Sequence, residues 1–181
     1  MRKKRGSNIL TTAILLMLGA ALLFGRLYQA SPPSPAQSDF TGRCVGVTDG
    51  DTIRVLHAGR EERVRLFGID CPERGQAYHS ATREFTSELA LGRTLRVQWR
   101  GRDRYGRVLG WVELPDGRIL NVEIVRAGMG WWYRRYAPDS RELASAEREA
   151  RSARRGLWKD RSPTPPWEFK RRTGAAPTPT E

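Results

Sequence analysis

Apolar and polar residues alternate in several short runs between residues 44 and 114, and a period of two residues predicts β-strands. Asp-Gly at residues 49–50 and Pro-Asp-Gly at residues 115–117 interrupt the pattern and are typical of tight turns. Residues 58–61 are expected to form the loop of a hairpin. The predicted strands cover residues 44–47, 52–56, 63–69, 94–100 and 108–114.

Helical spacing replaces this alternation at three places along the chain. The first is a repeat with a period of four residues, made by Ala77, Ala81, Phe85 and Leu89. Gly92 closes this predicted helix. Asn121 is predicted to cap a second, short helix. Asp139 and Glu142 form a capping box that predicts a third helix, which Gly156 stops.

Five short strands interleaved with three helices predict an α+β domain built on a five-stranded β-barrel of the OB-fold type. A chain of 181 residues is long enough for one such domain with additional tails. The candidate core residues are Ile53, Val64, Phe67, Phe85, Trp99 and Trp111.

The N-terminus departs from this pattern, because basic residues 2–5 precede an apolar run over residues 9–24. A positive flank of this kind predicts a targeting segment, assigned to residues 1–28, with the rest of the chain translocated. The run is intermediate between a signal-peptide core and a full membrane span, and bulky Tyr28 weakens the cleavage signal. We therefore favour an uncleaved signal anchor in the cell membrane over a secreted or periplasmic protein, with a cytosolic protein as a third alternative.

Proline-rich sequences flank the predicted domain on both sides. Residues 29–39 contain three prolines and form a Pro/Ser linker, because proline cannot join a helix interior or a central strand. The folded domain is assigned to residues 40–161. Residues 162–181 form a Pro/Arg-rich tail that is expected to be partly disordered.

Charge and cysteine content narrow the classes of function. The net charge of +12 favours a polyanionic partner, either nucleic acid or an anionic membrane surface, although it also serves solubility. The two cysteines, Cys44 and Cys71, lack the spacing of a structural zinc site. Sequence leaves open whether they form a disulfide or remain free thiols. We expect a monomer.

The candidate chemistry lies in three short patches between residues 49 and 107. Asp51 and Asp70 each flank a predicted strand beside a turn, where carboxylates and main-chain carbonyls can bind a hard cation such as Ca²⁺. Glu73 follows a proline that restricts the backbone, and is either a general base or a carboxylate at a helix N-terminus. Arg65 and Arg107 lie in otherwise apolar runs and are either phosphate ligands or surface residues.

An aromatic and basic cluster, Trp-Trp-Tyr-Arg-Arg-Tyr, occupies residues 131–136. It is suited to stacking bases and contacting phosphates of a single strand. The alternative is that at least two of its aromatic residues belong to the core.

Together these patches resemble the thermonuclease family, whose type member is staphylococcal nuclease. The resemblance runs from about residue 44 to residue 158 and rests on the order and spacing of several motifs. They are Asp-Gly-Asp-Thr at 49–52, Arg65 five residues before Asp70, Asp-x-Pro-Glu at 70–73, Asp-x-Tyr-Gly-Arg at 103–107 and the segment 121–128. The resemblance implies a five-stranded OB-fold barrel with three helices. It also implies calcium-dependent hydrolysis of DNA and RNA at the 5′ P–O bond, which leaves 3′-phosphates.

The resemblance assigns roles to individual residues. Asp51 and Asp70 look like the calcium carboxylates, and Cys71 stands where the family supplies a main-chain carbonyl ligand, often from threonine. Glu73 is similar to the presumed general base. The neighbouring thiol of Cys71 is the main departure from the family pattern.

The remaining roles concern the substrate. Arg65 and Arg107 look like the pair that binds the scissile phosphate and stabilises the transition state. Tyr105 and Tyr136 fall where the family lines its nucleotide pocket, while Arg134 replaces another tyrosine there. This replacement puts the geometry of small-nucleotide binding in question, but not the chemistry.

Three functions therefore compete. The first is a calcium-dependent nuclease that acts on DNA and RNA outside the cytoplasmic membrane. The second is a catalytically silent OB-fold nucleic-acid-binding protein tethered to the membrane. The third is a structural membrane-anchored protein that holds DNA through its basic surface without cleaving it. The presence of both aspartates, the glutamate and both arginines favours the first.

Overall fold

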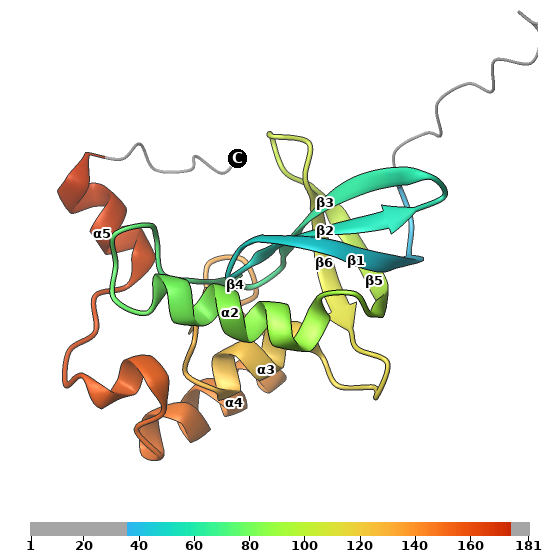
Figure 1. Cartoon of the computed structure of the whole chain (residues 1–181). Coiled ribbons are helices and arrows are strands. Elements are labelled where there is room, and N and C mark those ends of the chain that lie inside the picture. The colour runs from blue at the N-terminus through green and yellow to red at the C-terminus, as the bar shows by residue number, and fades with distance from the viewer. Residues whose placement is uncertain (1–35, 175–181) are drawn as a thin grey trace, which may run out of the picture. The chain divides into compact units, whose positions relative to one another are not determined.

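The computed structural model describes residues 36–174, and its centre is a closed five-stranded β-barrel (Figure 1). The barrel strands are β1 (Phe40–Asp49), β2 (Thr52–His57), β3 (Arg60–Leu66), β5 (Thr94–Arg102) and β6 (Val108–Glu113). They are hydrogen-bonded in the order β1-β2-β3-β6-β5. All neighbours are antiparallel except β3 and β6, which run parallel. The predicted α+β fold with a five-stranded barrel is confirmed.

The third predicted strand, over residues 63–69, is divided into two in the structure. β3 ends at Leu66, and Gly68 turns the chain with a φ of 76°, a conformation that favours glycine. The chain then forms the short strand β4 (Ile69–Asp70), which pairs with β7 (Trp131–Trp132) outside the barrel. This division places Asp70 beside the end of the barrel instead of within its wall.

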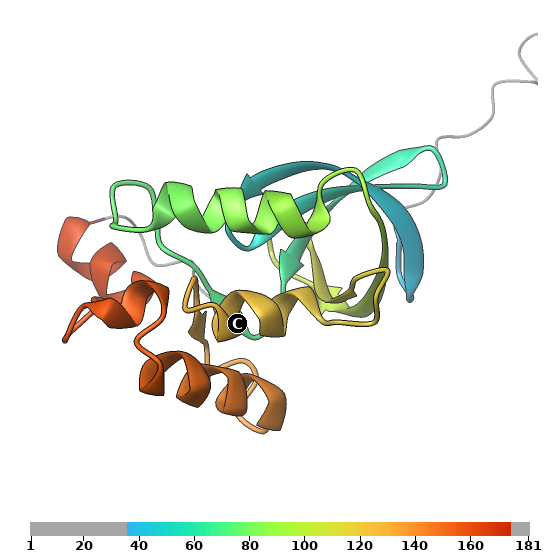
Figure 2. The ribbon, with the colours of Figure 1, turned by 60° about the horizontal axis from the view of Figure 1, so that its bottom comes forward.

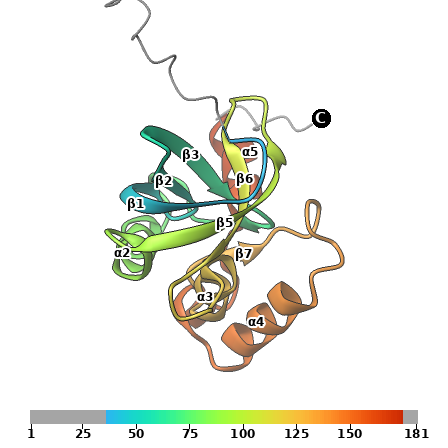
Figure 3. The ribbon, with the colours of Figure 1, turned by 90° about the vertical axis from the view of Figure 1, so that its right-hand side faces the viewer.

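The helices surround the barrel and extend away from it (Figures 2 and 3). In the part of the chain that the structure describes, they are α2 (His79–Ala90), α3 (Leu120–Arg126), α4 (Arg141–Ser152), the 3-10 helix η1 (Gly156–Lys159) and α5 (Pro166–Thr173). The first three α-helices correspond to the predicted ones. α5 was not among them and lies inside the segment expected to be a tail.

Both predicted helix caps need correction. Asn121 lies inside α3, whose N-cap is Ile119, and its buried side chain cross-links the barrel instead. Its amide oxygen accepts from the Val112 N–H at 3.0 Å, while its amide nitrogen donates to the carbonyls of Phe67 and Gly110 at 2.9 and 3.1 Å. A buried amide at this position ties main-chain groups of the barrel to α3 through hydrogen bonds.

The cap of α4 is displaced by one residue from the prediction. Ser140, not Asp139, is the N-cap, and its hydroxyl accepts from the Leu143 N–H at 3.3 Å. Ser140 also donates its hydroxyl proton to the Glu142 carboxylate. The cap therefore uses the same glutamate as the predicted capping box with a different partner.

The core fills the barrel and the space beneath its helices. Ile53 and Val64 are fully buried, as predicted. The other four predicted core residues are partly buried and pack against this core: Phe67, Phe85, Trp99 and Trp111. Because full burial of such a side chain contributes about 1.5–3 kcal/mol, this core fixes the positions of the strand ends that carry the site.

Cys44 and Cys71 are both buried and free. Burial raises the pKa of both thiols, which keeps them protonated near neutral pH. The structure therefore agrees with the free-thiol alternative.

The predicted targeting segment, residues 1–28, lies outside the residues that the structure describes, as does most of the predicted linker. Within residues 36–174, none of the helices has the length and apolar character needed to cross a bilayer.

Candidate active site

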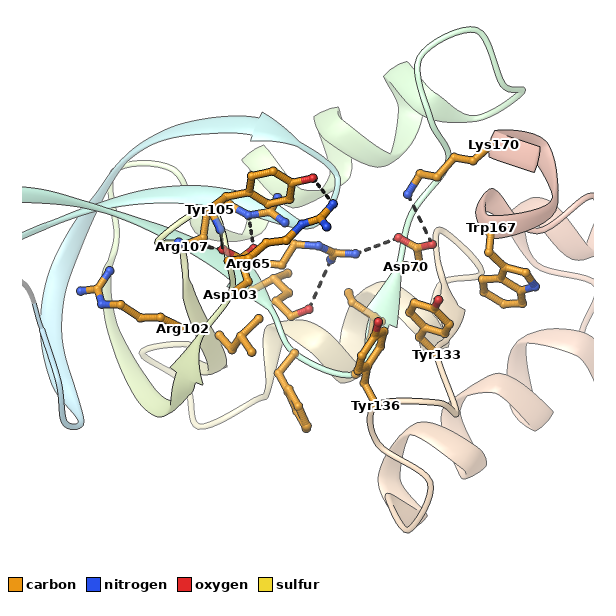
Figure 4. A pocket seen from close by; sticks show the side chains of 16 residues that line it. Arg65, Asp70, Arg102, Asp103, Tyr105, Arg107, Tyr133, Tyr136, Trp167 and Lys170 are labelled. Atoms are coloured by element: carbon orange, nitrogen blue, oxygen red, sulfur yellow. Dashed lines mark hydrogen bonds and ion pairs between the residues drawn. The ribbon is translucent and has the colours of Figure 1, made fainter. Parts of the chain in front are cut away.

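Two buried carboxylates meet at one arginine at the end of the barrel (Figure 4). Asp51 lies in the turn between β1 and β2, Asp70 ends β4, and Arg65 lies on β3. The two Nη atoms of Arg65 lie 2.8 Å from Asp51 Oδ2 and 2.8 Å from Asp70 Oδ1. The three side chains retain only 15%, 10% and 3% of their exposure for Arg65, Asp51 and Asp70. The structure thus brings together three of the predicted site residues.

Local backbone packing fixes this arrangement. A Cβ on Gly50 would lie 2.3 Å from Thr82 of α2 and 2.9 Å from Cys71 Cβ, so only glycine allows the turn to pack this closely. The Asp51 carbonyl accepts from the Leu66 N–H at 2.8 Å, and Asp51 Oδ2 accepts from the Cys71 N–H at 2.8 Å. The turn is therefore tied to both β3 and β4.

The cluster of Asp51, Asp70 and Arg65 contains more acidic than basic groups. Burial raises the pKa of Asp51, and Arg65 opposes this shift while Asp49 and Asp70 add to it. Burial likewise raises the pKa of Asp70, against the effect of Arg65 and Lys170. Burial by itself lowers the pKa of Arg65, yet the two carboxylates raise it above its usual value. One guanidinium therefore faces more negative charge than it can neutralise.

This imbalance fits a divalent cation. Asp70 Oδ2 lies 4.0 Å from the Lys170 ammonium, which is beyond hydrogen-bond distance, although the side chain is almost fully buried. Two buried carboxylates that share one guanidinium are costly to keep charged unless a further cation approaches them. Hard oxygen ligands of this kind select calcium or magnesium over softer metals.

The protein side chains alone do not complete a metal site. Among residues 36–174, no group of three or more acidic, histidine or cysteine side chains is gathered closely enough to hold a metal ion. Further ligands would have to come from main-chain carbonyls and water, which is ordinary for calcium. The Cys71 thiol is buried and its raised pKa keeps it neutral, so a contribution from its carbonyl, as predicted, fits better than one from sulfur.

A cleft of about 270 Å³ opens beside this cluster, and it contains most of the predicted substrate residues. Arg65, Asp70, Arg107, Tyr105 and Tyr136 all line it (Figure 4). The two arginines converge because β3 and β6 pair in parallel, with Val64 opposite Val108.

Arg107 is held by the loop between β5 and β6, which projects from the barrel (Figure 1). Asp103 Oδ2 lies 2.6 Å from Arg107 Nε, and Asp103 Oδ1 accepts from the N–H groups of Tyr105 and Arg107 at 2.9 Å each. Gly106, with a φ of 74°, allows the tight turn between them. The guanidinium of Arg107 also lies 5.5 Å from the centre of the Tyr105 ring.

The aromatic cluster at residues 131–136 is divided between the two alternatives, because some of its rings are buried and others line the cleft. Trp131 is buried against Trp158, whereas Tyr133 and Tyr136 line the cleft. Tyr136 meets the Tyr133 ring edge-on at 4.7 Å, and Trp167 of α5 stacks on Tyr133 at 5.0 Å with an interplanar angle of 8°. These three rings form an aromatic wall opposite the arginines.

Arg134 does not line the cleft. Its guanidinium lies 4.6 Å from the centre of the Trp132 ring, and it pairs with the buried Glu147 of α4 at 3.4 Å. The position that departs from the family pattern is therefore used for packing α4 against β7.

Glu73 lies in the loop between β4 and α2, next to the cleft, and 36% of its side chain is exposed. α2 begins only at His79, so Glu73 is too far from the helix N-terminus to be explained by the helix dipole. Its Oε1 atom lies 2.8 Å from Lys170 Nζ. The Glu73 carboxylate is thus accessible to solvent and paired with the Lys170 ammonium.

Sequence reasoning gave no individual role to three residues that line the cleft, namely Asp103, Trp167 and Lys170. For α5 a signal was present: two prolines precede Trp167, and proline at the first helical position with basic residues in the last turn is typical of a short helix. The spacing of three residues between Trp167 and Lys170 puts both on one helix face.

Comparisons with known proteins identify the family to which this chain is related. A family model described as "Staphylococcal nuclease homologue" matches residues 63–160, a stretch that contains Arg65, Asp70, Glu73 and Arg107 but not Asp51. An "Uncharacterized endonuclease" of Escherichia coli is 44% identical over 135 residues, which cover 75% of this chain and 88% of that protein. A "Micrococcal nuclease" of Shigella flexneri is 40% identical over 146 residues, covering 76% and 84%. "Protein ParB" of Escherichia coli is 39% identical over 165 residues, covering 86% and 91%.

Proposed function

Since this chain belongs to the staphylococcal nuclease family and is a nuclease, we propose that it hydrolyses DNA and RNA with the help of calcium, cutting the 5′ P–O bond to leave 3′-phosphate ends. The observation that carries the proposal is the convergence of Arg65, Arg107 and Asp70 on one cleft, with Asp51 bound to Arg65 behind it. A calcium ion bound by Asp51, Asp70 and the Cys71 carbonyl would neutralise phosphate charge.

The two arginines bind the scissile phosphate. Arg65 approaches the cleft from β3 and Arg107 from the loop that leads into the neighbouring strand β6, so their guanidinium groups can contact different non-bridging oxygens of one phosphate. Negative charge grows on these oxygens as phosphorus becomes five-coordinate, and fixed donors stabilise that charge most in the transition state.

Glu73 is the proposed general base. As the oxygen of a water molecule attacks phosphorus, its proton passes to the Glu73 carboxylate, and the bond between phosphorus and the 5′ oxygen breaks. The leaving oxygen takes a proton from solvent. General base catalysis of this kind contributes about 10²–10⁴-fold to the rate. The partial exposure of Glu73 gives the attacking water access to it.

The aromatic wall and Tyr105 bind the nucleotide next to the scissile phosphate. Tyr136 on one side and exposed Tyr105 on the other present apolar faces to the cleft. Stacking tolerates every base and contributes about 1–3 kcal/mol per base, which suits an enzyme without sequence preference. No element of the cleft requires or excludes a 2′-hydroxyl, so both DNA and RNA are proposed as substrates.

The location of the reaction follows from the sequence outside the described residues. Basic residues 2–5 and the apolar run over residues 9–24 support a signal anchor, which would place a monomeric catalytic domain outside the cytoplasmic membrane. Cleavage of the segment would instead release the enzyme.

The test uses the purified full chain with single-stranded DNA or RNA, in calcium or in excess chelator, followed by analysis of the product ends. We expect cleavage only with calcium, 3′-phosphate products, and a loss of about 10²-fold or more in Glu73→Gln with an unchanged folded structure. Retention of DNA without cleavage, insensitive to chelator, would instead support a membrane-tethered binding protein.

A further inference from the structure

Helix α5 forms part of the wall of the cleft, although it lies outside the stretch that the family model matches. In Figures 1 and 2 it lies beside the loop that connects β4 to α2. Trp167 and Lys170 point from one face of this helix toward the cleft (Figure 4). A helix that contributes two side chains to a catalytic cleft is positioned to affect the reaction.

The Lys170 ammonium lies between the carboxylate of Glu73, the proposed general base, and that of Asp70, a proposed calcium ligand. Its Nζ atom is 2.8 Å from Glu73 Oε1 and 4.0 Å from Asp70 Oδ2, and the side chain is 17% exposed. Burial lowers the pKa of Lys170, but Asp70 and the hydrogen bond to Glu73 raise it above its usual value. The group therefore stays charged, and its contact with Glu73 is short.

Two further contacts, both on the N-terminal side of Lys170, hold α5 in place. Gln76, in the same loop as Glu73, donates to the Thr164 carbonyl at 2.8 Å and accepts from the Glu73 N–H at 2.8 Å. Trp167 stacks on Tyr133 with nearly parallel rings. The segment that carries Lys170 and the loop that carries Glu73 are therefore fixed to each other through both main chain and side chains.

We propose that Lys170 is a positioning residue for the hydrolytic reaction, which holds the Glu73 carboxylate at the edge of the cleft so that α5 completes the active site. The inference rests on the proposed role of Glu73 as general base. Glu73 lies on a loop that is not part of any helix or strand, and an unrestrained glutamate populates several rotamers. An ion pair with a docked lysine restricts the carboxylate to the orientation needed for proton transfer, and misplacement by about 1 Å can cost on the order of 10²-fold in rate.

The test compares Lys170→Met, Lys170→Arg and Arg171→Met in the full chain. Arg171 is the matched control, because it is exposed on the same helix and its replacement removes the same charge. Cleavage of a fluorescent single-stranded oligonucleotide at saturating calcium gives kcat and KM, and thermal unfolding reports folding. We expect Lys170→Met to lower kcat by about 10–100-fold with KM changed less than threefold. Lys170→Arg should recover most of kcat, and Arg171→Met should leave it unchanged.

A double variant separates positioning from direct substrate binding. In the Glu73→Gln background, measured by single turnover, Lys170→Met should have no further effect on the rate, because there is no base left to position. An additive effect in that background, or an effect on KM alone, would overturn the inference and make Lys170 a phosphate ligand. An equal loss in Arg171→Met, or a lowered melting temperature that accounts for the loss, would also overturn it.

The inference and the proposed function fail differently. If the wild-type chain does not cleave in calcium, the proposed function fails first. If it cleaves and Glu73→Gln is as fast as wild type, the assignment of the base fails. If Glu73→Gln is slow while Lys170→Met matches wild type, only the role of Lys170 is refuted.

Discussion

The two arginines of the site are held in contrasting ways. Arg65 lies in a barrel strand between buried Val64 and Leu66 and pairs with two buried carboxylates. Arg107 follows a turn in a projecting loop and pairs with one partner, Asp103. Sequence shows the same residue type near an acid in both cases. The structure shows that Arg65 is bound into the core by two carboxylates, whereas Arg107 is positioned by a local turn.

The difference arises from the balance of charge around each arginine. Asp103 and Arg107 form a one-to-one pair that is complete without a ligand. Arg65 is shared between Asp51 and Asp70, with Asp49 adding further negative charge. A buried cluster with excess negative charge favours the binding of a cation, whereas a balanced one-to-one ion pair does not. The half of the site that is proposed to bind calcium is therefore the half that is built into the core.

Arg65→Ala gives the largest expected effect, because it removes a phosphate ligand and leaves two buried carboxylates unpaired. We expect turnover to fall by orders of magnitude and the free energy of unfolding without calcium to fall by about 3–5 kcal/mol. Calcium should restore part of this stability, because it binds the folded carboxylates. Denaturant unfolding with and without calcium measures both effects.

Arg54→Ala is the control for this change, since Arg54 is exposed on the neighbouring strand β2 and pairs with exposed Glu61. Its loss should alter stability by no more than about 0.5 kcal/mol. An Arg65→Ala variant as stable as Arg54→Ala in the absence of calcium would refute the structural part of the comparison.

Arg107→Ala should lower the activity nearly as much as Arg65→Ala does, but it should have little effect on stability. We expect kcat to fall by about 10²–10³-fold, the range seen when one transition-state donor is removed. The free energy of unfolding should change by less than about 1 kcal/mol, because the loop is solvent-accessible and its partner can be hydrated.

Arg104→Ala is the matched control in the same loop, because it removes an equal charge from an exposed residue that also lines the cleft. It should affect turnover far less than Arg107→Ala. Equal losses in the two variants would mean that the loop contributes only general positive charge.

Asp51→Asn gives the smallest expected effect on the fold and tests calcium binding separately from stability. The amide keeps an oxygen for the Cys71 N–H and Arg65 while it removes one buried negative charge. We expect the calcium concentration for half-maximal activity to rise at least about tenfold, equivalent to about 1.4 kcal/mol of binding free energy. Stability without calcium should change by less than about 1 kcal/mol, since lower desolvation offsets the weaker ion pair.

Asp49→Asn controls for loss of a nearby charge, because Asp49 ends β1 beside the same turn and its carboxylate accepts from the Asp51 N–H. The assignment of Asp51 as a ligand fails if both variants give the wild-type calcium titration.

Local patterns in the sequence predicted the secondary structure correctly wherever a short segment determines its own conformation. Alternation located the barrel strands, and an Asp-Gly turn located Asp51 between two of them. Capping was less predictable, because Asn121 had a helix-start signal but is used to bind main-chain groups of the barrel. A polar side chain that can cap a helix can equally satisfy a buried amide, and only the surrounding fold decides between these.

The contribution of α5 could not be found by the same means. Its prolines and basic residues fit a short helix as well as a tail, and the helix was not predicted. Lys170 lies almost one hundred positions from Glu73 in sequence, and nothing in local composition indicates that they meet. Contacts of this kind depend on how Trp167 packs on Tyr133, which is a property of the assembled domain.

The sequence by itself determined the barrel, the identity of the acids and arginines, and their order along the chain, because each depends on residue type and short-range periodicity. The tertiary structure alone decided that Arg65 is shared by two buried carboxylates and that a C-terminal helix brings a lysine to Glu73. The physical reason is that charge balance and burial are set by which groups become neighbours, and neighbours distant in sequence are chosen only when the whole chain packs.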